Sequence, residues 1–187
     1  MSAATHRFTP LQRLLHWTMA AAVLAMLLIG VGMVSTVSPR YWALVSIHRP
    51  LGIVILVLAL LRLGVRLRHG APELPADLPQ WQRLGAKGSH LALYGLMIAM
   101  PLVGWAMLSA GGYPIVLLGS LRLPPILPHD DALYGAFRIA HTWLAYLLFT
   151  TFLAHLAAAL FHGLVRRDGV FTSMAPKLVQ FHLGRAE

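Results

Sequence analysis

Four stretches of this chain are long and apolar enough to cross a lipid bilayer, and this feature constrains the fold more than any other. A hydrocarbon core about 30 Å thick needs about 20 helical residues. Of the 187 residues, 58% are hydrophobic and only 11% are charged, whereas about a quarter of a typical soluble domain is charged. We therefore predict an all-α, integral membrane four-helix bundle. Its spans are expected at residues 14–34, 47–65, 90–108 and 139–165.

Two further features of the apolar pattern carry expectations of their own. Residues 113–127 form a shorter apolar segment that is interrupted by Arg122, Pro124 and Pro125, so we expect it to be interfacial or re-entrant. The first span follows two arginines, as a secretory signal would. Its apolar core is longer than that of a signal peptide and no small-residue cleavage site follows it, so we expect it to remain in the mature chain.

The fifteen lysines and arginines are distributed unevenly between the two ends of the predicted spans. Eleven fall on one side, namely Arg7, Arg13, Arg62, Arg66, Arg68, Arg83, Lys87, Arg166, Arg167, Lys177 and Arg185. The other side has Arg40, Arg49, Arg122 and Arg138. Because basic residues concentrate on the cytoplasmic side of membrane proteins, both termini are predicted to be cytoplasmic. This orientation accounts for the net charge of +9, and we predict no nucleic-acid binding.

Capping patterns predict where the helices begin. Thr9 stands at an N-cap position, with Pro10 next and Gln12 three residues after the cap, which is a capping-box pattern. The helices are therefore expected to project beyond the bilayer. The other starts are predicted at Ser38 and Pro39, near Pro79, and at Asp130 or Asp131.

Ten histidines occur in the sequence, and four of them lie in tails or loops, where we expect solvated side chains. His141 and His155 are different, because both lie in the fourth span, fourteen residues apart. Fourteen helical residues turn the chain by about 1,400°, about 40° short of four full turns, and advance it by about 21 Å. The two imidazoles therefore share one face of the helix at two depths of the membrane.

The predicted topology gives each of these two histidines a partner on another helix. His16 lies at the cytoplasmic level of His155, and His48 lies at the outer level of His141. Two levels with two imidazoles each are what two six-coordinate haems require, because each iron takes one axial nitrogen from either side. A polar residue hydrogen-bonded between helices is the alternative for any one of them. The chain has no cysteine, so any haem is non-covalent and b-type.

Two glycines follow the same spacing. Gly30 is fourteen residues after His16, and Gly104 is fourteen after His90. A missing side chain at these positions would let the edge of a macrocycle approach the backbone. Ordinary small-residue packing between membrane helices explains them equally well.

These residues lie in segments that resemble the bacterial cytochrome b561 family. The segments are TPLQRLLHW, SIHRPLGIVILVLALLRLGVRL, GSHLALYGLMIAMPLVGWAM and HTWLAYLLFTTFLAHLAAALFHGLVRRDG. The resemblance covers residues 7–174 and implies one four-helix, di-haem transmembrane domain over that range, followed by a cytoplasmic tail at 175–187. It also implies a multi-pass protein of the bacterial inner membrane.

The resemblance further implies two haem b groups whose irons have histidine axial ligands. Residue by residue, His16 and His155 match the ligands of the inner haem, and His48 and His141 match those of the outer haem. Some members of the family are similar to a superoxide oxidase, which oxidises superoxide at the periplasmic face and passes the electrons to ubiquinone. We therefore expect an oxidoreductase that transfers electrons across the membrane.

Four arginines on the outer side suit this chemistry in two ways. Arg40, Arg49, Arg122 and Arg138 would create a positive potential that concentrates a small anion such as superoxide. Alternatively, Arg49 and Arg138 would bind haem propionates, because each is close in sequence to an outer histidine and a guanidinium holds a carboxylate in a bidentate manner. Both roles stay open for these two residues.

A quinone at the inner side needs a hydrogen-bond partner and a source of protons. His90 and His162 are not used by either inferred haem, and both are predicted near the cytoplasmic side. Histidine titrates near neutral pH, so either residue is a candidate for binding and protonating a reduced quinone. A structural role for His90, such as a hydrogen bond to a propionate, is equally compatible with the sequence.

Two other functions remain open. A haem-bearing membrane subunit could pass electrons between a partner dehydrogenase or hydrogenase and quinone. A metal or proton transporter would also place histidines in the membrane, but acidic residues usually accompany them and the predicted spans contain none. The expected partners are membrane lipid, quinone and superoxide or another small periplasmic electron donor, and the sequence allows a homo-oligomer or a redox partner subunit.

Overall fold

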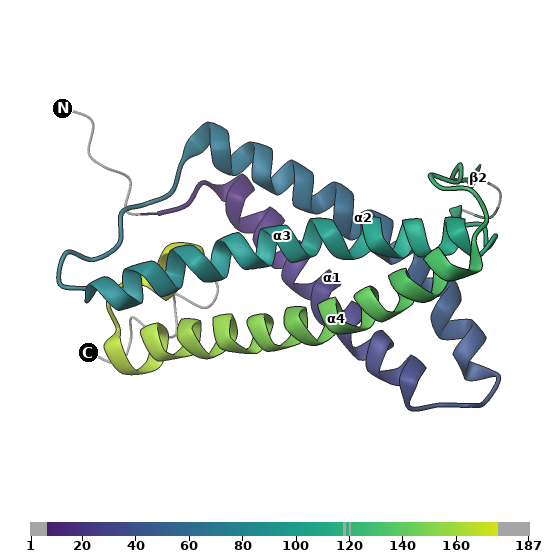
Figure 1. Cartoon of the computed structure of the whole chain (residues 1–187). Coiled ribbons are helices and arrows are strands. Elements are labelled where there is room, and N and C mark those ends of the chain that lie inside the picture. The colour runs from purple at the N-terminus through teal and green to yellow at the C-terminus, as the bar shows by residue number, and fades with distance from the viewer. Residues whose placement is uncertain (1–6, 118, 120, 176–187) are drawn as a thin grey trace.

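The structure, a computed structural model, describes residues 7–117, 119 and 121–175. Four long helices dominate it (Figure 1), and each is long and apolar enough to span a membrane. They are α1 (Pro10–Val34), α2 (Arg40–His69), α3 (Gln80–Ala110) and α4 (Asp131–Leu160). The predicted all-α membrane bundle is therefore confirmed. The beginning of α1 and the end of α4 lie at the same end of the bundle (Figure 1), and the assignment of that end to the cytoplasm stays a prediction.

The capping patterns place the helix starts where the sequence predicts them. The Gln12 amide N–H donates to Thr9 Oγ1 over 3.2 Å, and the Thr9 amide N–H donates to Gln12 Oε1 over 3.0 Å, which completes the capping box of α1. The Leu133 amide donates to Asp130 Oδ1 over 2.9 Å, so Asp130 is the cap of α4. Helices α2 and α3 begin directly after prolines and have no side-chain cap at that position.

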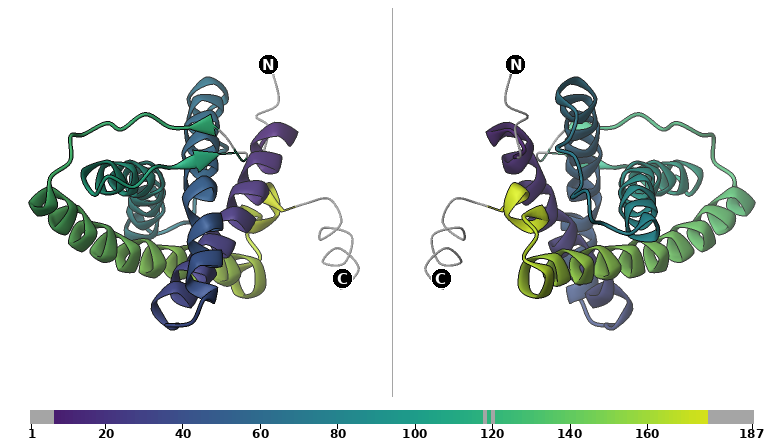
Figure 2. Two further views of the ribbon diagram at one scale, coloured as in Figure 1. Left: turned by 90° about the vertical axis from the view of Figure 1, so that its right-hand side faces the viewer. Right: turned by 90° about the vertical axis from the view of Figure 1, so that its left-hand side faces the viewer.

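The helices pack as a chain of neighbours, α1 on α2, α2 on α3 and α3 on α4. Among the described residues, α4 makes at most slight backbone contact with α1 or α2. Figure 2 shows α4 crossing the bundle from the side of α3 to the side of α1. Helix α4 is thus held by α3 and stands apart from the two helices that carry His16 and His48.

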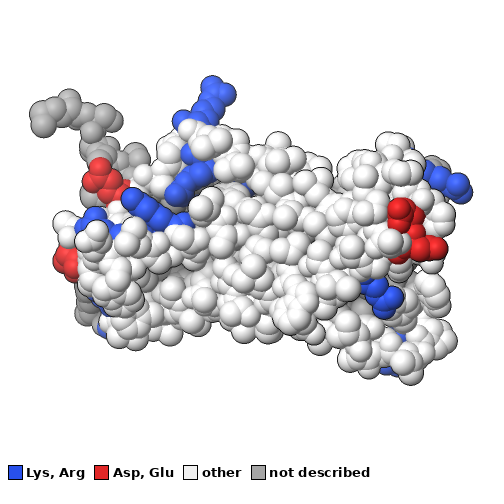
Figure 3. Space-filling view, in the orientation of Figure 1, with Lys and Arg blue, Asp and Glu red and all other residues white. Residues whose placement is uncertain are grey.

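The apolar core lies in the middle of the bundle and is small. Leu148, halfway between His141 and His155 along α4, belongs to it. The surface around this core is apolar as well: Leu28 is 65% exposed and Leu91 is 76% exposed, as expected for side chains that face lipid. Figure 3 shows an almost uncharged band between two charged ends. The core residues are Met19, Val23, Ile55, Ala59, Leu96, Met97 and Leu148.

The short apolar segment after α3 forms a hairpin at the end of the bundle (Figure 1), which agrees with an interfacial position. Its strands β1 (Val116–Leu117) and β2 (Leu121–Arg122) are antiparallel. Two hydrogen bonds that involve side chains of α3 attach the segment to this helix. Trp105 Nε1 donates to the Pro124 carbonyl over 3.0 Å, and the Ile126 amide donates to Ser109 Oγ over 3.1 Å.

At the opposite end, α4 continues as a π-helix, η1 (Phe161–Arg166), and the chain then reverses into a short helix, α5 (Val170–Met174). The reversal uses positive φ angles at Arg167 (52°) and Gly169 (84°). Trp17 Nε1 donates to the Met174 carbonyl over 2.9 Å, which fastens α5 to α1. Of the predicted tail at 175–187, all but the first residue lies outside the described residues.

Candidate functional site

The structure brings the four sequence-predicted histidines together in two pairs. The rings of His16 and His155 face each other with their centroids 6.3 Å apart and their planes at 67°. The rings of His48 and His141 lie 6.1 Å apart at 65°. We call these the inner pair and the outer pair, after their predicted sides of the membrane. Each pair bridges from α4 to a helix that α4 scarcely contacts, α1 for the inner pair and α2 for the outer.

The spacing of both pairs fits a metal ion bound between the rings. An imidazole nitrogen lies about 2.0 Å from a first-row metal, and the ring centre about 1.15 Å beyond it, so two axial imidazoles of one iron have centroids about 6.3 Å apart. The two separations, 6.3 and 6.1 Å, therefore leave room for a metal ion between the rings when a nitrogen of each ring points inward. The angle between ring planes is not restricted by this geometry.

The outer pair also has unsatisfied nitrogens. The Nδ1 atoms of His48 and His141 are buried and have no partner in hydrogen-bond geometry among the described residues, although the Met100 backbone lies near enough to interact with His141. An unsatisfied buried polar group costs roughly 1–3 kcal/mol. Two bare imidazoles are therefore an unfavourable arrangement here unless a bound group engages them.

Glycines shape the surroundings of the pairs in two different ways. A Cβ atom at Gly104 would lie 3.3 Å from His141 Cε1, so the absent side chain lets α3 approach the outer pair. A Cβ atom at Gly30 would meet nothing within 4 Å. Gly104 thus accommodates the ring of His141 itself, whereas Gly30 borders open space, as the predicted approach of a macrocycle would need.

The inner pair lies in an open cleft. His90 lines the same cleft, and its ring centroid is 5.5 Å from that of His155. Arg62 and Tyr94 form the polar remainder of the lining, and the other walls are apolar. Two facing imidazoles, apolar walls and a cation are a set of side chains that fits a flat, iron-bearing macrocycle with carboxylate groups. The apolar lining residues are Met19, Ala20, Val23, Leu93, Met97 and Phe152.

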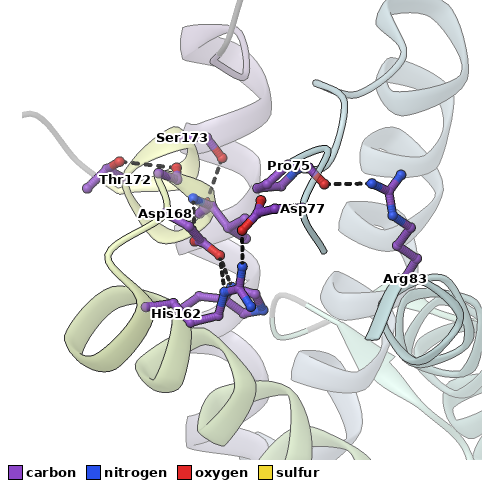
Figure 4. A network of polar contacts seen from close by, with 10 residues as sticks. Pro75, Asp77, Arg83, His162, Asp168, Thr172 and Ser173 are labelled. Atoms are coloured by element: carbon purple, nitrogen blue, oxygen red, sulfur yellow. Dashed lines mark hydrogen bonds and ion pairs between the residues drawn. The ribbon is translucent and has the colours of Figure 1, made fainter. Parts of the chain in front are cut away.

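His162, the second sequence-predicted quinone residue, does not line this cleft. Its Nδ1 lies 2.7 Å from Asp168 Oδ2 (Figure 4), and both side chains are largely buried. Arg166 joins the cluster, because its Nε donates to Asp168 Oδ2 over 2.9 Å and its NH2 donates to Asp77 Oδ2 over 2.7 Å. The cluster connects η1, the turn before α5 and the link between α2 and α3. His162 sits in the π-helical turn, a feature that is frequent at functional sites.

Asp168 is held as a carboxylate by its partners. Burial raises its pKa, but hydrogen bonds from His162, the Val170 amide and Arg166 lower it, and the net effect is a pKa below the usual value of 3.8. An ionised carboxylate only accepts hydrogen bonds, so Nδ1 of His162 carries a proton and, in the neutral ring, Nε2 is the acceptor. The arrangement can hand a proton to a ligand through a histidine whose orientation is fixed by an acid.

The four outer arginines differ in exposure. Arg49, next to His48, is half-buried, whereas Arg40, Arg122 and Arg138 are exposed. None of the four has an acidic partner within the described part of the chain. Both of the roles that the sequence suggests, propionate binding and attraction of an anion, remain compatible with these positions.

Sequence reasoning missed Arg62 as a site residue. Its Nε donates to Tyr94 Oη over 3.0 Å, and its NH1 reaches the Gln12 carbonyl at 3.5 Å. A signal was present: Arg62 follows His48 by fourteen residues, the same spacing that links His141 to His155. In the sequence, Arg62 is one of the basic residues that orient the bundle, and that role alone does not indicate a site residue.

Comparisons with known proteins agree with the geometry. Residues 7–177 match the prokaryotic cytochrome b561 family. The chain is 30% identical to Cytochrome b561 homolog 1 of Escherichia coli K12, over 92% of this chain and 98% of that protein. It is 29% identical to Cytochrome b561 homolog 2 of the same organism, over 91% and 92% of the two chains. It is also 32% identical to the Probable superoxide oxidase CybB of Yersinia pestis, over 70% and 74%.

Proposed function

This chain belongs to the prokaryotic cytochrome b561 family, and from that premise we propose that it oxidises superoxide at the outer face of the inner membrane and reduces ubiquinone within it. The family establishes a multi-pass membrane oxidoreductase that transfers electrons and uses haem b. The donor, the acceptor and the number of haems are the proposed part. The observation that supports electron transfer through two haems is the pair of neighbouring histidine rings at each of two depths, and the exposed outer arginines support an anionic donor.

We assign one haem b to each pair. His16 and His155 would hold the inner haem, and His48 and His141 the outer one. Bound haem b supplies reversible one-electron chemistry through its iron. A haem held by two histidines would favour electron exchange over binding of oxygen. Along α4 the two histidines are fourteen residues apart, an axial rise of about 21 Å, and the apolar core around Leu148 separates them.

The outer arginines support an anionic electron donor. Arg40, Arg122 and Arg138 are exposed at the outer end, and the acidic residues described there are Asp130 and Asp131. The four outer arginines outnumber these two carboxylates, so the local charge stays positive. A positive potential raises the local concentration of superoxide and its rate of encounter.

Reduction of the quinone consumes protons. Two superoxide ions, one ubiquinone and two protons give two molecules of oxygen and one ubiquinol, which balances atoms and electrons. His90 is half-buried in the inner cleft, and His162 is coupled to Asp168 nearer the end of the bundle. We propose that His90 provides a hydrogen bond to a quinone carbonyl and that the coupled pair delivers protons to it.

The purified chain tests this function directly. Superoxide from a photochemical source should reduce a short-chain ubiquinone in the presence of the protein and no other polypeptide. The product is quantified as ubiquinol, with oxygen released in a ratio of about two to one from the balanced reaction. Reduction that requires a second, copurifying polypeptide would instead favour the haem-bearing subunit of a larger dehydrogenase or hydrogenase. No reduction under either condition would overturn the proposal.

A further inference from the structure

Arg62 is a charged side chain within a membrane span, and it has no carboxylate partner among the described residues. Its guanidinium is half-buried. A charged side chain within a membrane span has a high free-energy cost. Such residues therefore usually have a counter-charge or a function. The nearby acceptors, the Tyr94 hydroxyl and the Gln12 carbonyl, are neutral and leave the positive charge in place.

The guanidinium of Arg62, on α2, contacts both α1 and α3. Tyr94 of α3 accepts from Nε, Gln12 of α1 accepts from NH1, and the guanidinium carbon lies 5.9 Å from the centre of the Tyr94 ring. A guanidinium has five N–H donors, and these two contacts use only two of them. The remaining N–H groups, on Nη1 and Nη2, can donate to a ligand, and the two contacts fix their orientation.

Arg62 faces the cleft of the inner pair. It lines the same cleft as His16 and His155. With Tyr94 it also lines a second, smaller pocket on the side of Phe8, Gln12 and Arg66. Arg62 therefore stands at the boundary between the cleft and the end of the bundle.

Arg66 adds a second cation one helical turn further along α2. Its guanidinium carbon lies 5.5 Å from the centre of the Phe8 ring, and it too has no acidic partner in the described residues. The guanidinium groups of Arg62 and Arg66 thus lie one after the other between the cleft and the end of the bundle, and neither has an acidic partner among the described residues. Such an arrangement calls for an anion, which a neutral quinone does not provide.

We propose that Arg62 binds a propionate carboxylate of the haem held by His16 and His155, and that its charge raises the reduction potential of that haem. A haem carries two carboxylates on one edge, and the guanidinium fork binds a carboxylate through two hydrogen bonds. The reduced iron carries one positive charge less, so a nearby cation stabilises it relative to the oxidised form. Arg66 would strengthen the same field from the next turn. This inference rests on the proposed haem at the inner pair.

Redox titration of the purified, haem-loaded protein tests it. Arg62→Gln should keep both haems, and the midpoint potential of one haem should move to lower values while the other stays unchanged. Arg62→Lys should cause a smaller shift, because it keeps the charge without the fork. The matched control is Arg68→Gln, which removes the same charge from an exposed position of α2 and should leave both potentials unchanged. Equal potentials in Arg62→Gln and wild type would overturn the proposal.

Loading the protein with haem dimethyl ester identifies the anion. The ester has no free carboxylate, so wild-type protein should retain it at the inner level less well than haem b, whereas Arg62→Gln should retain the two alike. A difference in retention that persists in Arg62→Gln would contradict a propionate partner, as would a potential shift in haem b protein that disappears when bound phospholipid is removed, since a lipid phosphate would then be the anion. If the Arg62 variants fail to retain the inner haem, wild-type protein decides: it should retain the ester less well than haem b at the inner level, and equal retention would overturn the proposal.

Failure of the underlying function gives a different result. If the wild-type chain binds no haem, or if His155→Ala still binds both, the assignment of the inner pair is wrong. If wild type binds two haems and His155→Ala loses one, but Arg62→Gln changes no potential, only the role of Arg62 is wrong.

Discussion

The inner and outer histidine pairs have nearly the same ring spacing but very different surroundings. The inner pair opens onto a cleft that also contains His90 and Arg62, which has no acidic partner among the described residues. The outer pair is packed against the backbone at Gly104, and its buried Nδ1 atoms have no hydrogen-bond partner in the described part of the chain. The common spacing indicates a common cofactor, while the surroundings indicate two different tasks. The inner level has groups that can exchange protons with a ligand, and the outer level has exposed cations beyond a tightly packed pair.

Removing one histidine from either level should have the largest effect. His155→Ala should lose the inner haem and His141→Ala the outer one, each with one haem per chain remaining. Superoxide-driven quinone reduction should fall by roughly 100-fold or more in both, because even indirect changes around metal ligands cost 10–100-fold. Haem content and optical spectra of the two variants check this. Retention of two haems in either variant would contradict the assignment of one haem to each histidine pair.

Gly104→Ala should disturb the outer level alone. The new methyl group would lie 3.3 Å from His141 Cε1, so the ring has to move by a few tenths of an ångström. We expect a shift in the spectrum of the outer haem and a loss of about 1–3 kcal/mol in stability, typical of overpacking. Gly95→Ala, on the same helix with nothing within 4 Å, should change neither. Equal effects of the two variants would contradict the close contact between α3 and the outer ligand.

Asp168→Asn should affect the inner end only. The folded-state pKa of Asp168 lies below its usual value of 3.8. Its ion pairs therefore stabilise the fold at pH values above 3.8, and this stabilisation is lost as the pH falls through the lowered pKa. The variant should lose about 1–3 kcal/mol at neutral pH and show a weaker pH dependence below about pH 4. Thermal unfolding between pH 3 and 7 measures this. If quinone reduction keeps its full rate in a folded Asp168→Asn protein, the proposed proton delivery through His162 is wrong.

Charge removal at the outer surface should have the smallest effect. Arg138→Gln should lower the rate with superoxide by about two- to threefold at low salt, and less at high salt, because screening weakens attraction between exposed charges. Arg167→Gln removes an exposed charge from the opposite end and should leave the rate unchanged. A loss of the outer haem in Arg138→Gln would point instead to propionate binding by this residue.

Much of this arrangement could be predicted from the sequence, because it depends on helix periodicity. The fourteen-residue spacing of His141 and His155, together with alternating crossings, pairs each with a histidine on another helix. The capping box at Thr9 and Gln12 is a local pattern and appears as predicted. Helices α2 and α3 extend beyond the predicted spans, which agrees with the expectation that the helices project beyond the bilayer.

The rest depends on contacts between distant segments, which periodicity does not reveal. The partnership of His162 with Asp168 requires the chain to reverse at Arg167 and Gly169, and the ion pair between Arg166 and Asp77 joins residues 89 positions apart. The hydrogen bond from Gln12 Nε2 to the Gly70 carbonyl, 2.9 Å long, joins residues 58 positions apart. Arg62 is an intermediate case, since its spacing from His48 was visible but its three-helix setting was not.

The most direct test of the central claim is the haem stoichiometry and ligation of the purified wild-type chain. A pyridine haemochrome assay with protein quantitation, and electron paramagnetic resonance of the oxidised form, measure both in one preparation. The account predicts two haems b per chain, each low-spin with two histidine ligands. One haem per chain, or a high-spin iron with an open position, would contradict the assignment of the two histidine pairs.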